Sequence, residues 1–188
     1  MVKKSLSFLL LACIALPAAI HAAEAGFTLP APLSTANFPD DVYMDSLARL
    51  PQVQREDLDA QGRAAFDTYV SPGTGYASGL RGPIGVWMNS PALAQAMFDV
   101  RQRVRYESDR DQRLTELAII STAREINNQY EYTAHEPLAV AAGLEQDIID
   151  IVRFRRPVNA DTSAEGLGET ERVIIQFARE VISEERVS

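Results

Sequence analysis

Residues 115–143 read TELAIISTAREINNQYEYTAHEPLAVAAG. Apolar residues recur at helical spacing over residues 115–126, which predicts a core helix. The asparagine pair 127–128 interrupts this pattern, because asparagine favours caps and turns over helix interiors. A second helix is predicted after the pair, and Gly143 is well suited to the end of a helix. The stretch therefore predicts two helices joined by a tight asparagine turn.

The second helix carries the only histidine outside the first 21 positions. Glu131 and His135 are four residues apart, so their side chains project from one face of the helix and can touch. A carboxylate that accepts from one imidazole nitrogen raises the basicity of the ring and leaves the other nitrogen free to move a proton. If the helices fold back antiparallel, Glu116 differs in height from His135 by roughly 7 Å, a gap that long side chains nearly close. We take His135, Glu131 and Glu116 as the candidate catalytic group.

Two other interpretations of these residues stay open. A single helix histidine is more often a hydrogen-bonded core or surface residue than a catalyst. Glu116, Glu131 and His135 are also suitable in type as metal ligands, but one histidine makes a poor zinc or iron site. We expect neither a metal nor a cofactor.

Helical patterns occupy most of the remaining chain, without an alternating strand pattern or a hairpin signal. The pattern predicts an all-α protein, a single-domain helical bundle over residues 41–188. Apart from the two helices above, helices are expected at residues 41–50, 55–69, 91–106, 144–152 and 169–184.

Glycine is concentrated in one segment, SPGTGYASGLRGPIGVWMNSP, which spans residues 71–91. We expect this segment to be irregular. Long irregular loops inside compact domains are usually lids or binding loops, although a permissive connector is the alternative. Trp87 and Tyr76 are candidates to cap an apolar pocket there, with core packing as the other role for Trp87.

The first 25 residues have the features of a cleaved secretory signal peptide. Two lysines precede an apolar run that falls short of the about 20 residues a bilayer requires, and small residues follow it. The expected location is periplasmic or secreted, with no membrane span. A lipoprotein signal ending at Cys13 is the alternative, although the apolar run continues well past it. Residues 26–40 are expected to form an extended arm or a disordered segment.

Removal of residues 1–25 takes away every lysine, the only cysteine and His21. Schiff-base lysines, thiolate nucleophiles, disulfides and Cys/His zinc sites are then excluded. The net charge becomes −9 instead of −8, because two lysines and Glu24 are lost. Nucleic acid is therefore an unsuitable partner, since phosphate binding needs a basic surface.

Residues 113–152 resemble the carboxymuconolactone decarboxylase-like family, whose members have a Glu in an R-L-x-E-x-A-I-L helix and then Y-E-W-x-x-H-x-x-x-A before A-G. The glycine-rich segment GPIGVWMNSPALAQAM is similar to the G-P-x-x-x-x-x-x-S-P segment of that family. The resemblance implies a helical bundle, a small carboxylated or lactone-like substrate, no cofactor, and a homo-oligomer, either a trimer or a hexamer. We assign substrate binding to Tyr132, Trp87 and Arg113.

The chain departs from related families in two respects. Alkylhydroperoxidase-like proteins of the same superfamily carry Cys-x-x-Cys, whereas this sequence has Asn128 and Glu131 at those positions, so thiol peroxidase chemistry is excluded. Family members also continue for several helices beyond an arginine-valine-serine stretch, at which this sequence stops. The expectation is either a shortened variant or a truncated sequence.

Two hypotheses for function follow. The first is an exported His/Glu acid–base enzyme, a decarboxylase or a lactone-processing enzyme, in which His135 moves the proton, Glu131 orients it and Glu116 assists. The second is a non-enzymatic helical binding or assembly module of the same fold.

Overall fold

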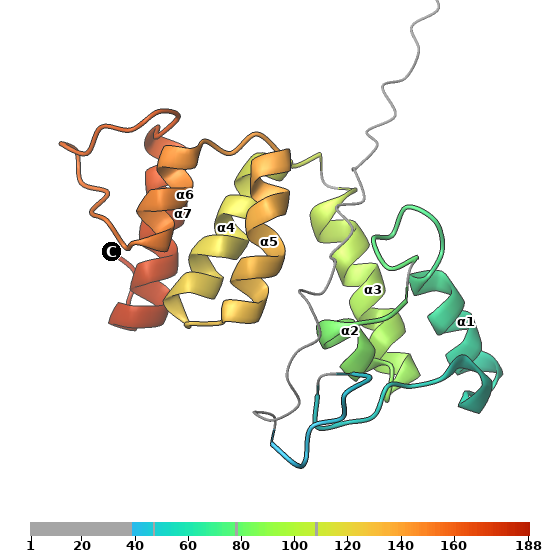
Figure 1. Cartoon of the computed structure of the whole chain (residues 1–188). Helices are drawn as coiled ribbons and strands as arrows, with labels where there is room; N and C mark the ends of the chain where they lie inside the picture. The colour runs from blue at the N-terminus through green and yellow to red at the C-terminus, as the bar shows by residue number, and fades with distance from the viewer. Residues whose placement is uncertain (1–38, 47, 78, 108) are drawn as a thin grey trace, which may run out of the picture.

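The computed structural model describes residues 39–46, 48–77, 79–107 and 109–188, and these residues form an all-helical protein (Figure 1). The predicted signal peptide, Cys13, and the predicted arm up to residue 38 lie outside the described residues. The principal helices are α1 (Ala60–Tyr69), α2 (Gly82–Trp87), α3 (Pro91–Arg105), α4 (Gln112–Glu125), α5 (Gln129–Ala141), α6 (Gln146–Arg153) and α7 (Glu169–Arg179). The all-α prediction is confirmed for this part of the chain.

The core is divided into two hydrophobic clusters. α4 packs against α5, α6 and α7 around a carboxy-terminal core, whereas α3 packs against α1 and α2 around an amino-terminal core. Figure 1 shows these helix groups side by side. Burial of one large apolar side chain stabilises the fold by about 1.5–3 kcal/mol, so the larger carboxy-terminal core contributes more. It contains Leu117, Ile120, Ala123, Tyr132, Ala139, Leu144, Ile148, Ile149, Ile151, Val152, Leu167 and Ile175.

The asparagine turn between α4 and α5 forms as predicted. Asn127 has a φ of 54°, the left-handed conformation that asparagine tolerates better than most residues. Asn128 caps α5, because its side chain accepts from the amide of Glu131 at 3.1 Å. Gly143 ends this helix pair with a φ of 88°. These local preferences fix the antiparallel arrangement on which the site depends.

The described residues of this range, 41–46 and 48–50, do not form the predicted helix. Tyr43 and Ala48 instead pair in an isolated antiparallel bridge, in which the amide of Tyr43 donates to the carbonyl of Ala48 at 2.8 Å. Ser46 Oγ accepts from the amide of Ala48 at 3.2 Å, and the Asp45 carboxylate also accepts from a backbone amide. Such side-chain bonds compete with a helix because they give the amides other partners.

The predicted helix at 55–69 is divided into a 3₁₀ turn, η2 (Arg55–Asp57), and α1. Asp59 separates the two, because its backbone is extended and its carboxylate accepts from the amide of Gly62 at 2.7 Å. Asp59 is therefore the residue that caps α1.

The glycine-rich segment is not irregular throughout, because it contains α2. A proline in the first turn suits the start of this helix. Ile84 and Met88 anchor the helix in the amino-terminal core, with exposures of 3% and 0%. Residues 71–77 and 79–81 remain irregular.

Two further helix boundaries differ from the sequence prediction. α4 begins at Gln112, where Asp111 caps it by accepting from the amide of Arg113 at 2.9 Å. The last predicted helix changes after Arg179 into a π-helical turn, η3 (Glu180–Glu184).

Gly82 provides a close contact between the two helix groups. Its φ is 57°, and a β-carbon placed on it would lie 2.2 Å from the hydroxyl oxygen of Tyr130 on α5. Only glycine allows this tyrosine to lie against the backbone at the start of α2.

We therefore expect Gly82→Ala to destabilise the protein more than Gly73→Ala. Both glycines have positive φ, 57° and 84°, but nothing lies within 4 Å of a β-carbon at Gly73. Backbone strain costs about 1–2 kcal/mol in each variant. A β-carbon at residue 82 must in addition displace the end of the Tyr130 side chain, so Gly82→Ala loses further stability. Denaturant unfolding measures the difference. In a Tyr130→Ala background the additional cost should disappear, and its persistence would show that the tyrosine contact is not the cause.

Candidate active site

His135 lies on α5 between two carboxylates. Its Nδ1 is 2.7 Å from Oε2 of Glu116 on α4, and its Nε2 is 3.3 Å from Oε1 of Glu131 on its own helix. The Glu116 side chain is 4% exposed, the His135 side chain 13% and the Glu131 side chain 34%. Nδ1 therefore has the shorter and better shielded contact, whereas Nε2 faces the more accessible side. The structure brings together all three residues of the predicted catalytic group.

The position of Glu116 follows from the asparagine turn. α4 and α5 run antiparallel against each other, so Glu116, near the start of α4, comes beside the middle of α5, where His135 lies. The sequence predicted an offset of roughly 7 Å along the axes. The long glutamate side chain closes this offset and ends in a short hydrogen bond.

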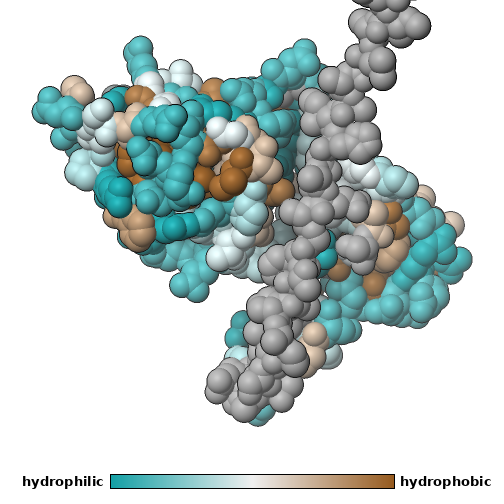
Figure 2. All heavy atoms as spheres, turned by 45° about the horizontal axis from the view of Figure 1, so that its top comes forward, coloured by the Kyte–Doolittle hydropathy of each residue, from teal (hydrophilic) through white to brown (hydrophobic). Residues whose placement is uncertain are grey.

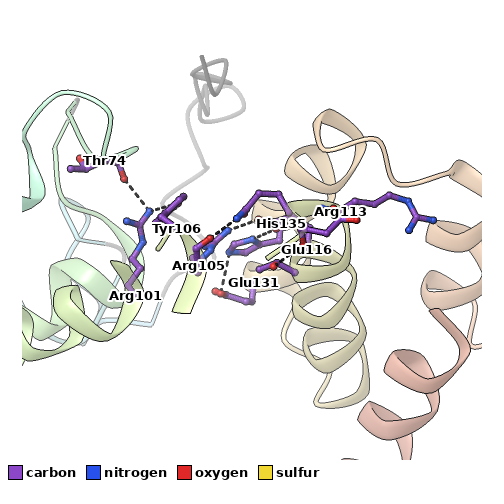
Figure 3. A network of polar contacts seen from close by, with 11 residues as sticks. Thr74, Arg101, Arg105, Tyr106, Arg113, Glu116, Glu131 and His135 are labelled. Atoms are coloured by element: carbon purple, nitrogen blue, oxygen red, sulfur yellow. Dashed lines mark hydrogen bonds and ion pairs between the residues drawn. The ribbon is translucent and has the colours of Figure 1, made fainter. Parts of the chain in front are cut away.

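Arg105, at the end of α3, contacts the candidate catalytic group from the amino-terminal helix group. Its guanidinium forms an ion pair with Oε1 of Glu116, the oxygen that His135 does not use. The side chain of Gln112 also donates to the carbonyl of Arg105. Figure 3 shows Arg105, Glu116, His135 and Glu131 as one continuous polar network. Sequence reasoning missed this role, because the partner of Arg105 lies on another helix.

The electrostatic balance favours a protonated imidazole. Burial lowers the pKa of His135, but the hydrogen bonds to Glu116 and Glu131 outweigh it and raise the pKa from 6.5 to about 9. The hydrogen bond from His135 in turn lowers the pKa of Glu131, against the effect of burial. At neutral pH both ring nitrogens then carry protons and donate to carboxylates. Two cations, His135 and Arg105, balance the two glutamates.

This arrangement suits proton donation. The hydrogen bond to Glu116 fixes the orientation of the imidazole ring. The contact at Nε2 is longer, so the Nε2 proton is available to a ligand that displaces Glu131. Removal of the proton would leave a neutral imidazole next to an ionised glutamate, which favours reprotonation from water.

The contacts described for the three residues assigned to substrate binding are with residues other than His135. Tyr132 is 8% exposed and belongs to the carboxy-terminal core, and Trp87 packs against the amino-terminal core. Arg113 reaches away from His135 in Figure 3 and donates to the carboxylates of Glu145, at 2.9 Å, and Glu171, at 2.6 Å. Its guanidinium thus holds the starts of α6 and α7 against α4.

Two hollows on the described surface lie elsewhere. One, of about 440 Å³, adjoins residues 156–164, and the other, of about 730 Å³, lies between residues 157–159 and α7 with the following residues. Neither is lined by His135. Within the described residues, no three His, Cys, Asp or Glu side chains are arranged to hold a metal ion.

Comparisons with protein-family models, with curated proteins and with solved structures found no match. In the described part of the chain, no helix combines the length and apolar character needed to cross a bilayer. The resemblance of residues 113–152 to the carboxymuconolactone decarboxylase-like family therefore remains a hypothesis.

The raised pKa of His135 predicts that stability falls at alkaline pH. The folded pKa of about 9 exceeds the ordinary value of 6.5, so the stabilisation is complete below pH 6.5 and is lost as pH rises through 9. The total loss is at most about 3 kcal/mol. Urea unfolding at pH 6 and pH 9.5 measures it. His135→Gln should remove this pH dependence, whereas Glu136→Gln, next to it in sequence, should keep it. If the free energy of unfolding of His135→Gln fell between pH 6 and pH 9.5 as much as that of wild type, the loss could not be assigned to His135.

Proposed function

We propose that this chain is an exported acid–base enzyme of the carboxymuconolactone decarboxylase-like kind, acting on a small carboxylated or lactone-like molecule. The observation that supports this proposal most is the imidazole of His135, held by Glu116 on Nδ1 and contacted only loosely by Glu131 on Nε2. The proposed location is the periplasm or the extracellular space, and the proposed assembly is a trimer or a hexamer.

The proposed step is protonation of a substrate carbanion or enolate. In a decarboxylation, the bond between the substrate carbon and its carboxylate breaks, CO₂ departs, and the electron pair stays on the substrate. The imidazolium of His135 stabilises the developing negative charge and then transfers its Nε2 proton to the carbon. The neutral imidazole regains a proton from water, while Glu116 keeps the ring in place through Nδ1.

The second candidate is a helical binding or assembly module. Val173, Phe177 and Val181 lie four residues apart along α7 and η3 and are exposed by 60%, 55% and 42%. Figure 2 shows hydrophobic surface on the half of the molecule formed by α4 to α7. Exposed apolar side chains that are grouped in this way are typical of contact surfaces. In such a module, His135 would serve only to join α4 to α5.

A pH–rate profile tests the enzymatic proposal. Candidate substrates are 3-oxo acids, assayed by CO₂ release, and small lactones, assayed by ring opening. Because the protonated imidazole is the active form, turnover should fall as pH rises through about 9. His135→Gln should reduce turnover by about 10²–10⁴-fold.

Glu136→Gln is the matched control, because Glu136 adjoins His135 in sequence but pairs with Arg153. It should keep the wild-type rate and profile. A rate that instead rises through pH 6.5 would indicate a neutral base, and equal rates in His135→Gln and wild type would favour the assembly module.

A further inference from the structure

The larger of the two hollows described above lies along α7 and the residues that follow it. Its volume is about 730 Å³, and His135 is not among the residues that line it. Its apolar wall includes Val173, Phe177 and Val187, which are 60%, 55% and 58% exposed. A ligand that covers these side chains removes apolar surface from water, which favours binding.

Arg179 lines the same hollow, and its side chain is only 16% exposed. The Nη2 atom of its guanidinium is buried and has no hydrogen-bond partner among the described residues. Burial lowers the pKa of Arg179, and the nearby carboxylate of Glu125 offsets this shift only in part. Because arginine stays protonated in proteins, the cost of burying its charge remains until an anion pairs with the guanidinium.

The carboxylate of Glu125 does not fully neutralise this guanidinium. Its Oε1 lies 3.7 Å from Nε of Arg179 and 3.5 Å from Nε of Arg155, so two cations share one anion. Its Oε2 accepts from the hydroxyl of Ser183 at 2.8 Å. One positive charge is therefore in excess within this group of three ionised side chains.

The other charged side chains that line the hollow have partners or are screened by water. The carboxylate of Glu180 accepts from the amide and the hydroxyl of Ser188, at 2.8 Å and 2.9 Å. Arg172 donates to three carbonyls of the loop that precedes α7. The side chain of Glu184 is 45% exposed, so solvent weakens its effect on a ligand. Arg179 is thus the charged group that retains a donor for a ligand.

We infer that this hollow binds a small carboxylate that carries an apolar chain. A rotation of the flexible Arg179 side chain lets Nη2 donate to the carboxylate, while the apolar chain covers Val173 and Phe177. This class of ligand supplies both an anion for a buried cation and a cover for an exposed apolar wall. A neutral apolar molecule supplies only the cover, and a small inorganic anion supplies only the charge. The site does not involve His135 and is independent of the proposed function.

Titration calorimetry with decanoate tests this inference, and decanol, which has the same chain without the charge, is the matched ligand. At pH 7 the full chain should bind decanoate at least about 10-fold more tightly than decanol, because a charge-assisted hydrogen bond is added. Arg179→Gln should weaken decanoate binding about 10- to 100-fold and leave decanol binding unchanged. Arg186→Gln is the control, because Arg186 is 80% exposed and does not line the hollow, and it should bind both ligands as wild type does.

A second variant keeps the test valid if Arg179→Gln does not fold. Val173→Asp changes an exposed side chain of the wall, so it should fold, and its carboxylate should repel decanoate and weaken its binding more than that of decanol. Equal affinities of wild type for decanoate and decanol, or wild-type decanoate binding in Val173→Asp, would overturn the inference. If wild type binds no decanoate and self-associates in sedimentation, whereas Phe177→Ser is monomeric, this surface is a contact between copies and the inference is wrong.

Discussion

The hydrogen bond between Glu116 and His135 is the contact on which the rest of this structure depends. It joins the start of α4 to the middle of α5 across a buried space, with a 2.7 Å separation and a glutamate only 4% exposed. A carboxylate at this depth is costly unless it is paired, and Glu116 is paired twice, with His135 and with Arg105. The burial of Glu116 therefore depends on its pairing with Arg105 and with a protonated His135.

Arg105 extends this dependence to the other helix group. α1, α2 and α3 have their own core. The Arg105–Glu116 ion pair and the hydrogen bond from the Gln112 side chain to the Arg105 carbonyl tie α3 to α4. Arg105 also lies near the ring of Tyr106, with its guanidinium 5.7 Å from the ring centroid, and Tyr106 accepts a hydrogen bond from Arg101. The glycine-rich loop, α3 and His135 are connected through these residues.

The sequence predicts the parts of this arrangement that local preferences determine. The Asn127–Asn128 turn, the cap of α5 and the i,i+4 placement of Glu131 and His135 all follow from backbone and side-chain preferences. Arg105 could not be predicted, because its partner lies across a tertiary contact and a helix-terminal arginine already has a local explanation. Arg113 lies in the segment that resembles the family, and its pairing with Glu145 and Glu171 could not be predicted either, because both partners are distant in the sequence.

The central claim is that His135 is an imidazolium at neutral pH, and NMR titration of its ring protons tests this most directly. The signals are assigned by their absence in His135→Gln, which leaves His21 as the other histidine. A midpoint near 9 in wild type, and a markedly lower midpoint in Glu116→Gln, is the predicted result. A wild-type midpoint at or below 6.5, unchanged in Glu116→Gln, would contradict the claim.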